Sequence, residues 1–148
     1  MKRSSTFPLV EFALLAAVIL AGCASGAKPL TGADKDAVLA YSEPQTENLF
    51  QGYNQKDYAA FSKNFDAAMS KALNEASFTN LENTLMPKIG KYVSRSVSSV
   101  ATDGKYIQVV YTAKFEQEDG VTVRLVFTPD DPHNITGLWF DSPKLREK

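Results

Sequence analysis

Strict alternation of apolar and polar residues in the second half of the chain constrains the fold more than any other feature. Residues 107–115 and 121–128 place an apolar side chain at every second position, the period of a strand with one buried face. Asp103 and Gly104 predict a hairpin before the first of these segments. With further strands expected at residues 92–100 and 135–141, the sequence predicts a four-stranded antiparallel sheet.

Helical signals fill the first half of the folded part. Pro44 is well placed in the first turn of a helix that Asn54 would end. Asp57 and Asn74 are of the type that caps helices, and Pro87 is expected to end the third helix. Helices followed by strands indicate the α+β class, with three N-terminal helices packed on the sheet.

The N-terminus predicts export. A short basic region precedes an apolar run over residues 12–21, which is too short for a membrane-spanning helix of about 20 residues and fits a secretory signal peptide. The run ends in Leu20-Ala21-Gly22-Cys23, which resembles the lipobox of prokaryotic lipoproteins. That resemblance implies removal of residues 1–22 and attachment of a diacylglyceryl group to Cys23. The alternatives are a plain cleaved signal peptide with an incidental cysteine, or an uncut anchor.

Lipidation would attach the protein to a membrane on its extracytoplasmic side, at the cell surface or in the periplasm. Residues 23–35 are then expected to form the lipidated Cys23 and a flexible tether, residues 36–143 the domain, and residues 144–148 a C-terminal tail. The formal charge of −1 leaves no broad basic surface, so nucleic acid is not an expected partner. One cysteine supplies neither an internal disulfide nor a structural zinc site.

Four stretches resemble a known family. Residues 57–66 read Asp-Tyr-x-x-Phe followed by Phe-Asp, and residues 47–54, 89–92 and 135–140 fit the same family. The pattern is similar to a domain of unknown function found in small prokaryotic lipoproteins and assigned to the nuclear transport factor 2-like fold. The resemblance covers about residues 40–142. It implies a cystatin-like cone, in which a curved sheet wraps a long helix and leaves a cavity, and it implies no catalytic residues.

Aromatic residues are the candidates for a ligand pocket. Tyr53, Phe65, Tyr111 and Trp139 are expected between the helices and the sheet, where tyrosine and tryptophan combine apolar area with a polar group. The alternative is that these side chains only fill the core. His133 lies in a predicted turn without an orienting partner, and the acidic turns lack the spacing of a calcium loop. No catalytic, metal or cofactor site is therefore predicted.

Three functional hypotheses follow from this pattern. The first is a module that binds a small apolar ligand or another envelope protein. The second is a pocket enzyme of the isomerase or dehydratase type, which rests on fold analogy and requires a pocket carboxylate of raised pKa beside a tyrosine. The third is a structural spacer. The opposite sheet face mixes Tyr106, Val110 and Val126 with polar residues, so it is expected to be solvated or to form a modest homodimer surface.

Overall fold

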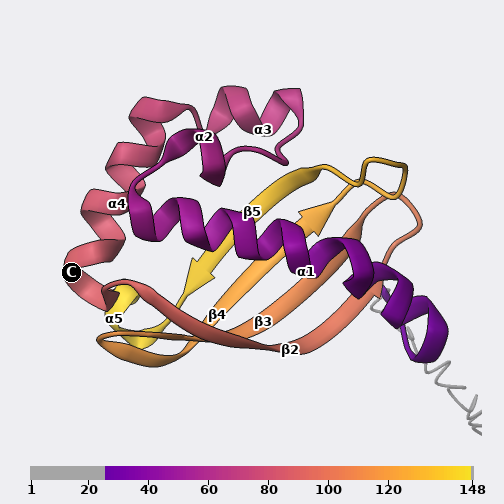
Figure 1. The fold of residues 1–148 in the computed structure, drawn as a ribbon. Coiled ribbons are helices and arrows are strands. Elements are labelled where there is room, and N and C mark those ends of the chain that lie inside the picture. Colours follow the sequence, from indigo (N-terminus) through magenta and orange to yellow (C-terminus); the bar gives the residue numbers. More distant parts are fainter. Residues whose placement is uncertain (1–25, 148) are drawn as a thin grey trace, which may run out of the picture.

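The computed structural model describes residues 26–147, so Cys23 and the predicted signal peptide lie outside the described residues. Five antiparallel strands form one sheet in the order β1-β2-β3-β4-β5, and helices cover one of its faces (Figure 1). The predicted α+β class and antiparallel meander are confirmed. The predicted number of strands is wrong, because a short fifth strand, β1, joins the sheet ahead of the helices.

The elements follow the chain with short connections. In order they are β1 Lys28–Pro29, α1 Gly32–Gln55, α2 Tyr58–Phe61, α3 Ala67–Ala72, α4 Glu75–Ile89, β2 Tyr92–Thr102, β3 Ile107–Phe115, β4 Glu118–Phe127, β5 Ile135–Asp141 and α5 Pro143–Arg146.

β1 lies in the segment whose composition predicts a flexible tether. Lys28 pairs with Thr102 and Pro29 with Ala101, both at the end of β2. The main-chain N–H of Leu30 then donates to the carbonyl of β2 residue 100 at 2.9 Å. These contacts use main-chain groups, which nearly all residue types share, so the composition of the segment does not predict them. Residues 28–35 therefore comprise β1, a two-residue connection and the start of α1.

α1 is longer than predicted at both ends. It begins at Gly32 and contains Pro44 in its interior, although that proline is better suited to a first turn. The helix stops at Lys56, which has a left-handed φ of 57°. Asn54, the predicted stop, instead pairs its side chain with the main chain of Tyr92, accepting at 2.8 Å and donating at 2.9 Å. These bonds tie the end of α1 to the start of β2.

The shorter helices confirm two predicted caps. The side chains of Asp57 and Asn74 accept hydrogen bonds from N–H groups in the first turns of α2 and α4. The predicted second helix is divided into α2 and α3. Pro87 does not end α4, which continues to Ile89 and stops at Gly90 with a φ of 77°. A proline keeps a helical φ, so the helix can pass through Pro87, but it loses one main-chain hydrogen bond there at a cost in stability.

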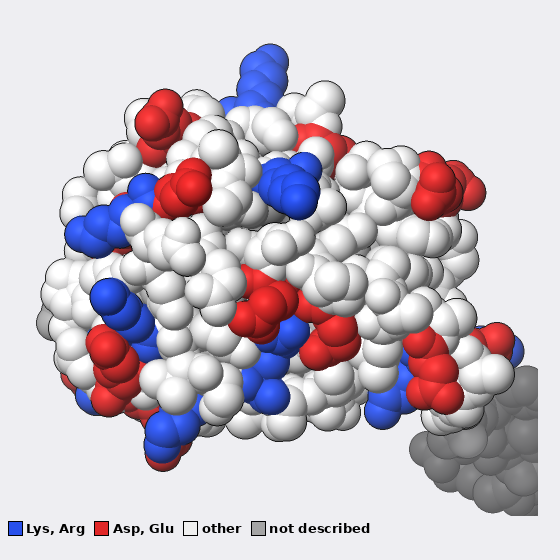
Figure 2. Space-filling view, viewed as in Figure 1, with Lys and Arg blue, Asp and Glu red and all other residues white. Residues whose placement is uncertain are grey.

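The core lies between the sheet and the helices, and α1 crosses the concave face of the sheet (Figure 1). α1 contributes Leu49, Phe50 and Tyr53, which are all buried. The central strands contribute alternate residues, namely Val109, Tyr111, Ala113, Phe115, Val121, Val123, Leu125 and Phe127. Acidic and basic side chains are interspersed on the helix-covered surface (Figure 2). Among the helices of residues 26–147, none is long and apolar enough to cross a bilayer.

Candidate functional site

Two of the predicted pocket residues are core residues beneath the helices. Tyr53 is fully buried and donates its hydroxyl to the carbonyl of Gly90 at 3.0 Å. Burial raises the pKa of Tyr53, and the charge of Glu82 adds to that rise. Phe65 packs edge to face against Phe61 with ring centres 5.4 Å apart. Each side chain is already occupied by contacts within the protein.

Tyr111 is the third predicted pocket residue, and it is buried under α1. Its hydroxyl lies 3.1 Å from the hydroxyl of Thr46, with which it shares a hydrogen bond. Burial raises the pKa of Tyr111 to about 12. The guanidinium of Arg95 lies 5.5 Å from the ring centre, so a cation covers the ring from β2. The phenol therefore stays protonated at neutral pH and serves packing.

Arg95 connects β2 to α1 through two ion pairs that the sequence did not indicate. Its guanidinium donates to Glu47 at 2.6 Å, to Glu43 at 3.2 Å and to the hydroxyl of Tyr92 at 2.8 Å. The Arg95 side chain is only 7% exposed. Burial acts to lower the pKa of Arg95, but the hydrogen bond to Glu47 and the charge of Glu43 outweigh it and leave the pKa raised. We interpret this cluster as a structural clamp.

A buried carboxylate lies on α4. Glu82 is 6% exposed, and its Oε1 atom has no hydrogen-bond partner in the protein. Burial raises the pKa of Glu82, while the charge of Lys56 acts in the opposite direction. The nearby Tyr53 hydroxyl is engaged with Gly90. This acid accordingly has a tyrosine neighbour but is separate from the hollows described below.

Trp139, the fourth predicted pocket residue, lies on the opposite face of the sheet and is 49% exposed. Ile135, four residues earlier, is fully buried on the inner face and pairs with Phe127. The register then shifts, and Val126 pairs with Gly137. A one-residue bulge reverses the inward and outward alternation beyond it, so Trp139 points outward. The four predicted pocket residues therefore do not share one pocket.

Gly137 allows the indole of Trp139 to lie close against the sheet. A Cβ atom at Gly137 would meet two ring carbons of Trp139 at 2.6 Å, well inside ordinary contact distance. Above the ring, the guanidinium carbon of Arg124 lies 4.4 Å from the ring centre. Arg124 pairs with Trp139 across β4 and β5. The indole is thus held between a strand backbone and a cation, a favourable arrangement for an aromatic ring at an exposed site.

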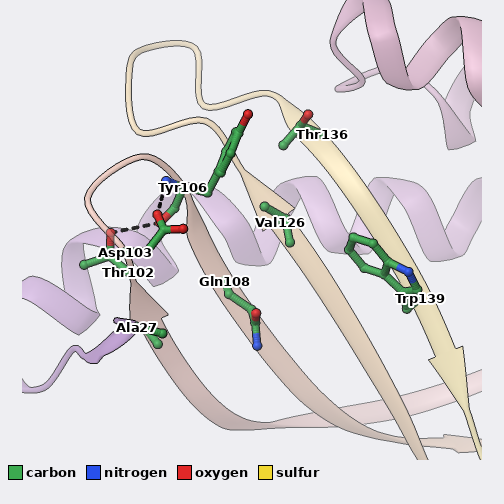
Figure 3. A pocket seen from close by; sticks show the side chains of 9 residues that line it. Ala27, Thr102, Asp103, Tyr106, Gln108, Val126, Thr136 and Trp139 are labelled. Atoms are coloured by element: carbon green, nitrogen blue, oxygen red, sulfur yellow. Dashed lines mark hydrogen bonds between the residues drawn. The ribbon is translucent and has the colours of Figure 1, made fainter. Parts of the chain in front are cut away.

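Two hollows flank Trp139 on this outer face, and we call them together the outer-face groove. The larger has a volume of about 330 Å³ and the smaller about 310 Å³, and both include Gln108 and Trp139. Tyr106 and Trp139 stand at opposite ends of the larger hollow, with Val126 between them (Figure 3). The remaining lining of the larger hollow is Ala27, Ala101, Thr102, Asp103 and Thr136. The sequence placed Tyr106 and Val126 on this face correctly, whereas Trp139 was expected inside.

The groove is lined by both apolar and polar side chains, and hydrogen bonds lower the pKa of its carboxylates. Asp103 accepts hydrogen bonds from the main-chain N–H groups of Tyr106 and Lys105, which lower its pKa. Asp141 is paired with Arg146, which lowers the pKa of that carboxyl. Both groups are ionised at neutral pH and are poor proton donors. This lining suits the binding of an amphipathic surface better than proton transfer.

His133 lies in a turn, as predicted, within the connection between β4 and β5. Its ring stacks on Tyr41 with the ring centres 3.8 Å apart. Its Nδ1 atom lies 3.3 Å from the carbonyl of Thr128. These contacts fix the ring against the domain and give it no acidic partner. No cluster of three metal-ligating side chains was found in the part of the chain that the structure describes.

One signal in the sequence pointed to the outer-face groove. An isolated glycine within a strand pattern indicates a bulge or a close approach of another group, and Gly137 marks both. A regular strand at residues 135–141, as predicted, does not include this bulge. Cys23, the predicted lipidation site, lies outside the residues that the structure describes.

Comparison with known proteins yields a family without an assigned activity. No curated protein and no solved structure matches this chain. The model of one family, described as "Protein of unknown function (DUF3887)", matches residues 46–138, a span that runs from α1 through most of β5. That span contains Trp139's supporting residues Arg124 and Gly137 and ends just before Trp139 itself. The match covers more than half of the chain, which therefore belongs to the DUF3887 family.

Proposed function

We propose that this protein is a lipid-anchored extracytoplasmic binding module and that the outer-face groove is its binding site. The observation that supports the site most directly is the position of Trp139, half exposed and lying against Gly137. An exposed aromatic ring grouped with other apolar side chains indicates an interaction surface more strongly than a single exposed side chain does, and Tyr106 and Val126 line the same hollow. Volumes near 330 Å³ are at the lower end of the range for small-ligand sites.

The anchor is the part of the proposal that rests on the sequence. Leu20-Ala21-Gly22-Cys23 follows a short apolar run, as in prokaryotic lipoproteins. Two acyl chains on Cys23 would supply stable attachment, since each buried methylene contributes about 0.8 kcal/mol. Cys23→Ser is expected to abolish incorporation of a palmitate analogue in cells. Continued labelling of that variant would contradict the anchor.

We further propose the nuclear transport factor 2-like cone as the finer description of the fold. The crossing of the concave sheet face by α1 supports it (Figure 1). So do the register shifts in β2 next to Ser94 and Ser99, because bulges bend strands. An experimental structure whose sheet is flat across α1 would contradict this description.

The binding site is testable with a fluorescent amphiphile. We use anilinonaphthalene sulfonate, whose emission rises on apolar surfaces, with the full chain and with Trp139→Ala. The variant is expected to lose most of the dye binding and about 1 kcal/mol or less of stability, since the side chain is half exposed. Val93→Ala is the matched control, because Val93 is 51% exposed and does not line either hollow. Equal dye binding by all three proteins would refute the site.

The enzyme alternative required a pocket carboxylate of raised pKa beside a tyrosine. In the groove, the carboxylate next to Tyr106 is Asp103, and its pKa is lowered by main-chain hydrogen bonds. The buried acid with a raised pKa is Glu82, whose tyrosine neighbour already donates to a main-chain carbonyl. The groove therefore favours the binding module over the isomerase or dehydratase.

A further inference from the structure

The first described residues of the chain meet the outer-face groove. Ala27 forms part of the wall of the larger hollow, and the next residue, Lys28, enters β1. Only four peptide units separate Ala27 from Cys23. A fully extended chain of that length reaches at most about 14 Å. If Cys23 carries the anchor, the groove cannot stand far from the bilayer.

The two exposed aromatic residues of the groove are of the kind found at membrane interfaces. Trp139 is 49% exposed and Tyr106 is 37% exposed, and both belong to the larger hollow. Tryptophan and tyrosine favour the headgroup level, because their rings are apolar and each carries one polar group. These residues lie on the sheet face near Ala27, whereas the helices cover the other face (Figures 1 and 3).

A basic side chain lies over each of these aromatic rings. Arg124 lies over Trp139 at 4.4 Å, and the Nζ atom of Lys105 lies 5.3 Å from the ring centre of Tyr106. Long basic side chains can hold an aromatic group at the acyl boundary while their charged ends reach lipid phosphate. The groove also carries the carboxylates of Asp103 and Asp141, the second of which is paired with Arg146, so charges of both signs lie on it, as they do in a phospholipid headgroup layer.

We propose that the outer-face groove lies against the bilayer that holds the anchor, with Trp139 and Tyr106 at headgroup level and Lys105 and Arg124 facing phosphate. This inference rests on the proposed function, whose binding site it assigns to phospholipid. It also gives the protein one orientation on the membrane, in which the helices face away from the lipid.

Trp139 is the single tryptophan of the chain, so its fluorescence reports on the groove directly. The experiment reconstitutes the full lipidated protein in vesicles of phosphatidylcholine and phosphatidylglycerol, with and without lipids brominated near the headgroup. We expect a blue-shifted emission relative to the Cys23→Ser protein, and quenching to half or less by the brominated lipid. The control reporter is Asn83→Trp in a Trp139→Phe background, which places an indole on the exposed side of α4 and should not be quenched.

Flotation separates the failure of this inference from failure of the anchor. Protein that floats with the vesicles while Trp139 remains unquenched, or is quenched no more than the indole at position 83, would overturn the orientation and leave the groove open to a soluble ligand. Lipid-free protein at the bottom of the gradient would refute the anchor and the orientation together. The double variant Lys105→Gln and Arg124→Gln should float equally but show weaker quenching. Unchanged quenching in that variant would overturn the role of the two cations.

Discussion

Gly52 is the position where a small substitution tests the packing of α1 most directly. A Cβ atom there would lie 2.2 Å from the main-chain nitrogen of Phe61 and 2.5 Å from its Cα atom. In an exposed helix, replacing glycine with alanine stabilises by about 1 kcal/mol. Here the backbone of α2 would have to retreat by roughly 1 Å, and Phe61 is 1% exposed in a close-packed core. Overpacking of this kind costs about 1–3 kcal/mol, so we expect Gly52→Ala to destabilise the fold.

The assay is equilibrium unfolding in urea, supported by thermal melting. A net loss of about 2 kcal/mol corresponds to a fall in Tm of roughly 8 °C for a domain of this size. Gln51→Ala is the matched control, because Gln51 is exposed on the same helix and loses only a hydrogen bond to Glu47. The control should change stability by no more than about 0.5 kcal/mol. A Gly52→Ala protein as stable as the wild type would refute the close approach of α2 to α1.

Three further changes test other parts of the fold. Burial raises the pKa of Glu82 in the folded state, so its contribution to stability is greatest below the unfolded pKa of about 4.3 and falls as the pH rises through the folded value. Glu82→Gln should therefore stabilise the protein in urea at pH 7 but not at pH 4, and an equal gain at both would contradict the assignment. Arg95→Ala should lower the free energy of unfolding by about 2 kcal/mol more than Arg95→Met does, because methionine still fills the space among the aromatic rings. Equal losses of stability in the two variants would show that only the charge of Arg95 matters. Deletion of residues 26–31 removes β1 and should lower Tm by several degrees, whereas an unchanged Tm would show that the strand adds nothing.

The strands were predictable because one face of the sheet is buried. Alternation marked β3 and β4, and Asp103 with Gly104 marked the hairpin that joins β2 to β3. Asp57 and Asn74 likewise predicted the starts of two helices, because capping depends on a few neighbouring residues. These features are local. They can be read from a sequence because the interacting groups lie within a few positions of one another.

The remaining features depend on partners that are distant in the sequence. β1 exists only because the end of β2 offers free main-chain groups to Lys28 and Pro29. Asn54 serves β2 instead of ending α1, because Tyr92 is brought beside it by the turn at Gly90. The side on which Trp139 appears is set by the register of β5 against β4. Periodicity alone does not report such pairings.

The bulge in β5 bears on function because stability does not account for what it produces. Trp139 is not part of the buried core, and the inner face of β5 is supplied by Ile135 and the partly buried Leu138 and Phe140. A glycine inside a strand weakens it, by about 0.5–1 kcal/mol relative to alanine, yet Gly137 is what lets the indole lie against the sheet. Gly137 thus lowers the stability of the strand, but it allows Trp139 to lie exposed on the sheet with Arg124 above its ring. Binding of Trp139 to a ligand or a membrane would explain this arrangement, which folding of the domain does not require.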